Sequence, residues 1–135
     1  MKPIKVVGAL IVKNKKVLAE VRKSNDDFGP SRTWVPGGHI EKNESPKKAM
    51  IREMEEEFDI IPKKYFYYCR LPWEHKNKDY EVHYFVCTKW KGKIKNKEAS
   101  KLIWIGSKNI KKFSEEIDRN IAQIYLTNVK KFNGR

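Results

Sequence analysis

The chain has 135 residues, with 30 Lys or Arg and 17 Asp or Glu, so its net charge at neutral pH is +13. This length favours a single domain over residues 1–135, which would bury roughly two thirds of its unfolded surface. No stretch is long and apolar enough to span a membrane, and the first residues lack a signal peptide's apolar run, so we expect a soluble cytoplasmic protein. The positive charge favours an anionic partner, although a lysine-rich composition without a specific partner also explains it.

The N-terminal part of the chain reads as a β-hairpin followed by a loop. Ile4–Val12 is apolar on both faces, as expected of an inner strand, and Asn14–Lys16 turns it into a second strand, Val17–Arg22. Lys23–Thr33 contains Ser, Asn, Asp, Gly and Pro, which marks a surface loop of the kind that lies over a binding site.

A helix is expected next, from Pro46 to Phe58. Ser45 is a good N-cap, and proline suits the first helical position because its missing N–H has no partner to lose there. At about 100° per residue, the helix has a core face and, beside it, a carboxylate face. That carboxylate face carries Glu53, Glu56 and Glu57.

These acids are unusual for a protein with so many lysines. Like charges three or four residues apart repel each other, and acids late in a helix oppose its dipole. A solvated helix surface is the simpler interpretation. A divalent cation would remove the conflict, because carboxylate oxygens are the ligands that Mg²⁺ and Mn²⁺ prefer.

The C-terminal half reads as strands followed by a second helix. Cys69 and Cys87 fall inside expected strands without metal-binding spacing, which favours reduced core thiols. Apolar residues recur at helical spacing near the end of the chain, so an amphipathic helix closes the domain. The expected segments are two long strands Tyr65–Trp73 and Tyr80–Trp90 around a turn Glu74–Asp79, a basic loop Lys91–Lys97, a strand Leu102–Ile105, and a helix from about Ser114 to Phe132.

The stretch 38–60 resembles the Nudix box, Gly-x5-Glu-x7-Arg-Glu-U-x-Glu-Glu-x-Gly-U, where U is aliphatic. The one departure is Asp59, where the family has glycine; Asp tolerates the left-handed conformation expected after a helix, so we expect a small stability cost and intact chemistry. The matching residues are Gly38, Glu44, Arg52, Glu53, Met54, Glu56, Glu57 and Ile60.

Outside the box, the chain resembles the small MutT-like subgroup of that family. Val35–Gly38 precedes the box, Trp90–Gly92 follows a long strand, and Glu98 lies before the Trp-containing strand Leu102–Ile105. The resemblance implies an α+β fold, the Nudix α/β/α sandwich with a mixed β-sheet between two helices. It also implies hydrolysis of a nucleoside diphosphate linked to a group X, dependent on Mg²⁺ or Mn²⁺.

The resemblance further implies roles for the acidic residues. Arg52 would hold Glu53 in place through a charge-assisted hydrogen bond. Glu44 would support the cluster, or it would simply favour the helix dipole near the N-terminus. Glu98 would be a metal ligand or general base, or an exposed acid without a function. The metal ligands would be Glu53, Glu56, Glu57 and a backbone carbonyl from Gly37 or Gly38.

Substrate contacts are expected from the loop and the last helix. Phe28 and Trp34 would stack on a base, or they would pack in the core. His39 would touch substrate, and Lys23 lies in the loop that is expected over the site. Asp118, at the start of the last helix, would read the base, or it would only favour the helix dipole.

Two classes of function remain open at this point. The first is a MutT-like nucleoside triphosphate pyrophosphohydrolase, with nucleotide sugars, dinucleoside polyphosphates and capped RNA as alternative substrates. The second is a non-catalytic basic module that binds RNA or DNA. The intact acid cluster favours the enzyme, because a binding module has no need for self-repelling acids. The oligomeric state is left open.

Overall fold

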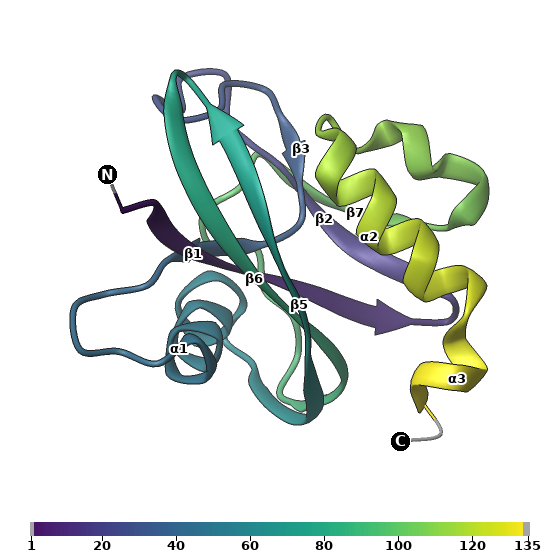
Figure 1. Cartoon of the computed structure of the whole chain (residues 1–135). Coiled ribbons are helices and arrows are strands. Elements are labelled where there is room, and N and C mark those ends of the chain that lie inside the picture. Colours follow the sequence, from purple (N-terminus) through teal and green to yellow (C-terminus); the bar gives the residue numbers. More distant parts are fainter. Residues whose placement is uncertain (1, 134–135) are drawn as a thin grey trace. The chain divides into compact units, whose positions relative to one another are not determined.

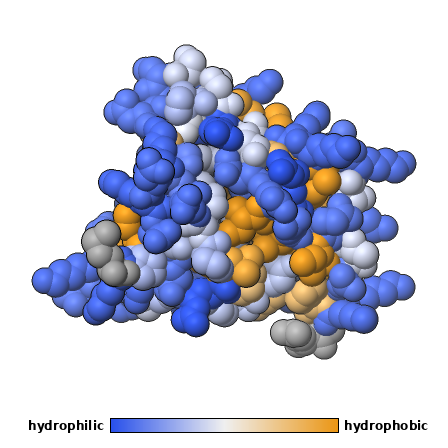
Figure 2. All heavy atoms as spheres, turned by 45° about the horizontal axis from the view of Figure 1, so that its top comes forward, coloured by the Kyte–Doolittle hydropathy of each residue, from blue (hydrophilic) through white to orange (hydrophobic). Residues whose placement is uncertain are grey.

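The computed structural model describes residues 2–133, which fall into two compact units. The first unit comprises Met1–Ile11 and Pro36–Glu98, and the second comprises Val12–Val35 and Ala99–Arg135. Strand β1 (Ile4–Lys13) passes from the first unit into the second, and each unit has a long helix of its own (Figure 1). Hydrophilic residues cover most of the face in Figure 2, in keeping with a chain that is 35% charged.

The first unit contains a mixed sheet. Residues 4–11 of β1 run parallel to β6, from the pair Ile4 and Tyr80 to the pair Ile11 and Cys87, whereas β4 pairs antiparallel with β1 and β5 with β6. Its other strands are β4 (Gly37–His39), β5 (Ile61–His75) and β6 (Lys78–Lys91).

The turn of the long hairpin is shorter than predicted. The predicted turn was Glu74–Asp79, but the strands continue to His75 and from Lys78. Lys76 and Asn77 have φ of 49° and 62°, and two consecutive residues with positive φ make the tight turn that suits the twist of a hairpin.

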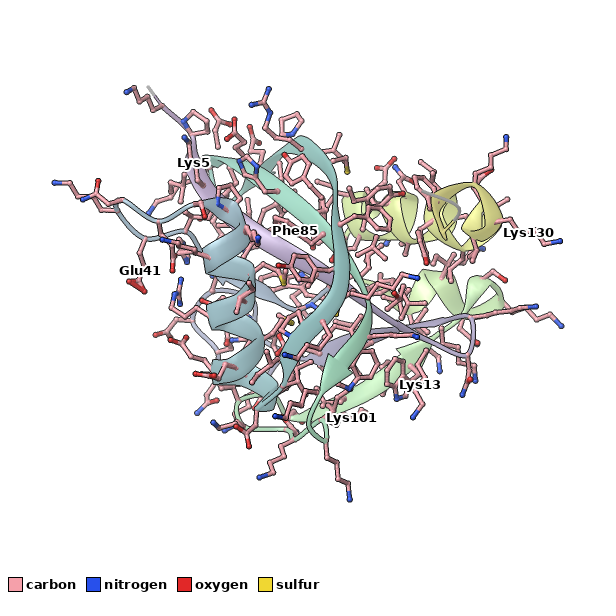
Figure 3. The ribbon with its side chains drawn as sticks, turned by 90° about the horizontal axis from the view of Figure 1, so that it is seen from below. Lys5, Lys13, Glu41, Phe85, Lys101 and Lys130 are labelled. Atoms are coloured by element: carbon pink, nitrogen blue, oxygen red, sulfur yellow. The ribbon has the colours of Figure 1, made fainter. Side chains whose placement is uncertain are left out.

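Helix α1 (Pro46–Phe58) has the predicted boundaries and caps. The Ser45 hydroxyl accepts a hydrogen bond from the Lys48 N–H at 3.1 Å, and Pro46 occupies the first turn. Asp59 closes the helix in the left-handed conformation, with φ 60° and ψ 37°, as predicted for the residue that replaces glycine. The helix buries Met50, Met54 and Phe58 completely. Phe85 of β6 lies on the side of the sheet that faces α1 (Figure 3).

The second unit combines short strands with the C-terminal helices. Strand β2 pairs antiparallel with the end of β1, with β3 and with β7. One helix to Phe132 was predicted, but α2 ends at Thr127. Asn128 has φ −121° and its side-chain amide donates to the Ile124 carbonyl, which caps the helix there. The elements are β2 (Lys16–Val21), β3 (Thr33–Trp34), β7 (Lys101–Ile105), η1 (Ser107–Lys112), α2 (Glu116–Thr127) and α3 (Val129–Asn133).

The α+β class and the mixed sheet are thus confirmed. Both cysteines are free thiols, and burial raises the pKa of the Cys87 thiol to about 11. No helix within residues 2–133 is both long and apolar enough to cross a bilayer.

Candidate active site

Arg52 is the centre of the candidate site in the first unit. Its guanidinium donates to both carboxylate oxygens of Glu44, at 2.8 and 2.9 Å, in a two-pronged ion pair. This contact lowers the pKa of Glu44 to about 2. Because Glu44 precedes α1 and Arg52 lies in its second turn, the ion pair fixes the loop that leads into the helix. Glu41, in the same loop, lies at its outer edge (Figure 3).

The same guanidinium also holds two of the predicted metal ligands. Arg52 Nη1 donates to Glu53 Oε1 at 2.9 Å and to Glu56 Oε2 at 3.2 Å, so these carboxylates lie side by side. Arg52 Nη2 donates to the His39 carbonyl at 3.0 Å, which ties β4 to the helix.

Glu53 lies in an electrostatically unfavourable place for a carboxylate. Its side chain is 13% exposed, and burial is the main cause that raises its pKa above the ordinary range. Arg52 opposes this shift, while the negative charges of Glu56 and Glu98 add to it. Glu98 therefore acts electrostatically on Glu53, although 45 residues separate them in the sequence.

Glu57 is the most deeply buried acid of the helix. It is 2% exposed and lies one turn after Glu53, on the same face of α1. Buried carboxylates cost free energy unless they are neutralised, bonded or bound to a cation.

The two glycines of β4 leave room for this cluster. A Cβ at Gly38 would fall on the Glu53 carboxylate, and one at Gly37 would fall on the Val7 carbonyl oxygen. Gly38 therefore provides the space in which the Glu53 carboxylate lies. A cradle that admits an acidic group, together with hard oxygen donors, fits a divalent cation. As they stand, no three His, Cys, Asp or Glu side chains in residues 2–133 are close enough to hold one ion.

The predicted substrate contacts fall into both units. His39, in the first unit, is exposed, and its ring lies 6.5 Å from that of Tyr80. In the second unit, the rings of Phe28 and Trp34 meet edge to face at 5.2 Å, and Lys23 is exposed at the start of the loop. Asp118 is 6% exposed, and its Oδ2 accepts a hydrogen bond from the Val35 N–H at 3.1 Å.

One polar cluster was not anticipated. The Tyr67 hydroxyl lies 2.9 Å from His83 Nδ1, and His83 Nε2 lies 2.7 Å from Glu81. The alternation of β6 places His83 and Glu81 on the same face of the strand, which was a usable signal in the sequence. Tyr67 comes from the neighbouring strand, so its part in the cluster depends on the register of β5 and β6.

Comparison with known proteins agrees with this site. A family model described as the NUDIX domain matches residues 2–123. The 8-oxo-dGTP diphosphatase of Escherichia coli K12 is 25% identical over 105 residues, which cover 78% of this chain and 81% of that protein. The CTP pyrophosphohydrolase of the same organism is 29% identical over 105 residues, covering 77% and 76%. The MutT protein of Methanosarcina mazei Go1 superposes with a TM-score of 0.78 at 22% identity, covering 99% of this chain and 98% of that one.

The chain belongs to the Nudix family. It is a Nudix hydrolase, an enzyme that acts on the phosphoanhydride bonds of nucleotides, and its resemblance to the MutT-like subgroup is confirmed. Nudix hydrolases generally use a divalent metal ion.

Proposed function

We propose that this enzyme hydrolyses a nucleoside triphosphate to a nucleoside monophosphate and pyrophosphate, using Mg²⁺ or Mn²⁺. The observation that carries the proposal is the acid cluster around Glu53, a partly buried carboxylate that Arg52 holds beside Glu56 and whose pKa is raised by burial and by two further acids. Such a cluster gains most from a divalent cation. The relatives named 8-oxo-dGTP diphosphatase and CTP pyrophosphohydrolase support a nucleoside triphosphate as the substrate.

The acidic residues of α1 would bind the metal ion, and Arg52 would position them. Glu53, Glu56 and Glu57, with a carbonyl from Gly37 or Gly38, would hold the ion. A bound divalent ion neutralises charge on phosphate oxygens and lowers the pKa of its water. Glu56 is 52% exposed and is held by Arg52 at 3.2 Å, so it would have to turn from Arg52 towards the ion to complete the ligand set. Arg52 orients Glu53, and Glu44 holds Arg52 in place.

Glu98 would accept the proton of the attacking water or bind a metal ion. The charge of Glu98 reaches Glu53, which supports either role. We also propose that the whole chain, residues 1–135, works as one Nudix domain, because the family match runs through both units. Its two free thiols suit a cytoplasmic location, where cysteines stay reduced.

Hydrolysis in ¹⁸O-labelled water tests the site of attack. We expect water to attack the β-phosphorus, so the label appears in pyrophosphate and the nucleoside monophosphate stays unlabelled. Mass spectrometry of the products of all common nucleoside triphosphates, with Mg²⁺ and with Mn²⁺, gives the answer. Label in inorganic phosphate, or only in the monophosphate, would show that another bond is broken. Turnover of X-linked diphosphates alone would move the substrate class to the alternatives.

Asp118→Ala should flatten base selectivity while hydrolysis continues. An ionised carboxylate offers only acceptors, so it would choose bases with adjacent donors, namely guanine or cytosine, in ordinary or modified form. A hydrogen bond to a charged group is worth about 1.5 to 3 kcal/mol, or roughly tenfold to a hundredfold in kcat/KM between bases. The measurement is kcat/KM for four bases in parent and variant.

The hydrogen bond from Val35 to Asp118 requires a control for stability, because removing it leaves a buried N–H without its acceptor. Melting temperatures of parent and variant separate a loss of fold from a loss of selectivity. An unchanged base preference in a folded variant would reduce Asp118 to support of the Val35 backbone.

A further inference from the structure

Three side chains of the β5–β6 hairpin, in the first unit, form a chain of hydrogen bonds that the proposed function does not use. The Tyr67 hydroxyl lies 2.9 Å from His83 Nδ1, and His83 Nε2 lies 2.7 Å from Glu81 Oε2. We call these three residues the tyrosine cluster. A hydroxyl, an imidazole and a carboxylate bonded in this order at these distances have the arrangement that activates a nucleophile in hydrolases.

The carboxylate of the tyrosine cluster fixes which nitrogen of His83 carries a proton. The hydrogen bond from His83 is the largest cause that lowers the pKa of Glu81, and the positive charges of Arg70 and Lys5 act in the same direction. Glu81 is therefore ionised and only accepts, which places the proton on His83 Nε2. The lone pair of His83 Nδ1 then faces Tyr67, so the tyrosine hydroxyl donates to it. In this orientation the imidazole can take the proton of the tyrosine.

The nucleophile of the cluster is accessible, and its base is buried. Tyr67 is 47% exposed and His83 is 8% exposed. The Tyr67 ring meets the Phe85 ring edge to face at 5.3 Å, which holds it against the sheet. Desolvation is the largest cause that raises the pKa of the Tyr67 hydroxyl, and the charge of Glu81 adds to it. The hydroxyl is therefore protonated at neutral pH, and an attack by its oxygen needs a base within reach, which His83 provides.

A hollow of about 560 Å³ adjoins the tyrosine cluster and shares Glu81 with it. Arg70 also lines the hollow, and its positive charge acts on the Tyr67 hydroxyl. A guanidinium in such a place stabilises the oxyanion that forms when a nucleophile attacks a carbonyl. Trp73 and Tyr80, whose rings lie 5.2 Å apart, line the hollow as well. Figure 1 shows the turn of the hairpin well away from α1, so this hollow is separate from the acid cluster of that helix.

The chemistry of these residues narrows the substrate. A tyrosine oxygen, with an ordinary pKa of about 10, displaces a leaving group of similar or lower pKa, such as a phenol, whereas an amide or alkyl ester would expel the tyrosine instead. Glu74 and Asp79 line the hollow together with Glu81, so an anionic substrate is repelled. The aromatic side chains there favour an aromatic group. A neutral aryl ester meets all three conditions.

We propose that the tyrosine cluster is a second, metal-independent site that hydrolyses neutral aryl esters, with Tyr67 as nucleophile, His83 as general base and Glu81 as positioning residue. Tyr67 Oη bonds to the carbonyl carbon while the hydroxyl proton passes to His83 Nδ1. The bond from that carbon to the phenol oxygen breaks, and the phenol leaves with the proton from His83. Water then bonds to the same carbon and gives a proton to His83, which returns it to Tyr67 Oη as the acyl bond breaks. The products are a phenol and a carboxylic acid.

The test follows phenol release from phenyl acetate in EDTA. Tyr67→Phe removes the nucleophile and keeps the ring, and His83→Gln removes the base. Tyr68→Phe is the matched control, because it removes a hydroxyl from the next residue of the same strand. In Tyr67→Phe and His83→Gln, kcat/KM on phenyl acetate should fall at least about a hundredfold, while Tyr68→Phe stays within about twofold of the parent. Hydrolysis of GTP with Mg²⁺ should stay within about twofold of the parent in Tyr67→Phe, because the acid cluster is untouched.

Mass spectrometry of the acid-quenched reaction locates the acyl group. The parent should carry an acetyl group on Tyr67, and His83→Gln should not. Melting temperatures of the variants check their folding, and Tyr67→Phe, at an exposed position, decides the matter if His83→Gln is unstable. Equal phenol release by the parent and Tyr67→Phe would overturn the proposal. Equal losses in Tyr67→Phe and Tyr68→Phe, or acetyl groups on lysines without one on Tyr67, would overturn it as well.

Discussion

Glu57→Gln is expected to lower kcat at least about a hundredfold while the fold stays intact. A metal ion contributes several kcal/mol to stabilising charge in the transition state, and a hundredfold corresponds to about 3 kcal/mol of that contribution. Glutamine has nearly the volume of glutamate, so packing around the 2% exposed side chain is preserved. Removing one of several neighbouring negative charges also relieves repulsion in the metal-free protein.

The measurement pairs steady-state kinetics with a melting temperature in EDTA. The expected pattern is lost activity with an unchanged or higher melting temperature. Glu55→Gln is the matched control, because Glu55 lies on the same helix but is exposed, and its variant should retain parental activity. A Glu57→Gln variant as active as the parent would end the assignment of this residue as a metal ligand.

The sequence predicted helix α1 well because its signals are local. Ser45, Pro46 and Asp59 each act within one turn of their own position, and the structure has the caps at those residues. The proximity of Arg52 and Glu53 also follows from their neighbouring positions, and their hydrogen bond was expected from the family resemblance.

Features that depend on pairing across the chain were less accessible. The contact of Arg52 with Glu44 depends on how the preceding loop folds back on the helix, whereas its contact with Glu56, four residues later on the same helix, is local. The cluster of Tyr67 and His83 depends on the register of β5 and β6, which contains three irregularities. The end of α2 at Asn128 depends on a competing side-chain hydrogen bond, which apolar periodicity does not reveal.

Gly38→Ala is expected to lower kcat by about a hundredfold with little loss of stability, because misplacing a catalytic group by about 1 Å costs this much. The new Cβ would fall on the Glu53 carboxylate, which is the far end of a flexible side chain and moves aside at small cost. Gly38 does not have a positive φ, so alanine adopts its backbone conformation without strain. The loss should therefore come from the displaced carboxylate alone.

Gly37→Ala is the informative contrast, one residue away on the same strand. Its Cβ would fall on the Val7 carbonyl oxygen, a backbone atom that cannot rotate away. We expect overpacking to cost about 2 kcal/mol, which lowers the melting temperature by roughly 5 to 10 °C.

Thermal unfolding, kinetics and calorimetric titration with Mn²⁺ on both variants separate the two effects. Gly38→Ala should bind Mn²⁺ more weakly while it melts near the parent temperature, and Gly37→Ala should melt early. If the Gly38→Ala variant keeps parental activity and parental Mn²⁺ affinity, the position of the Glu53 carboxylate beside β4 is not needed for catalysis. If the Gly38→Ala variant instead melts at a low temperature, Gly38 serves the fold.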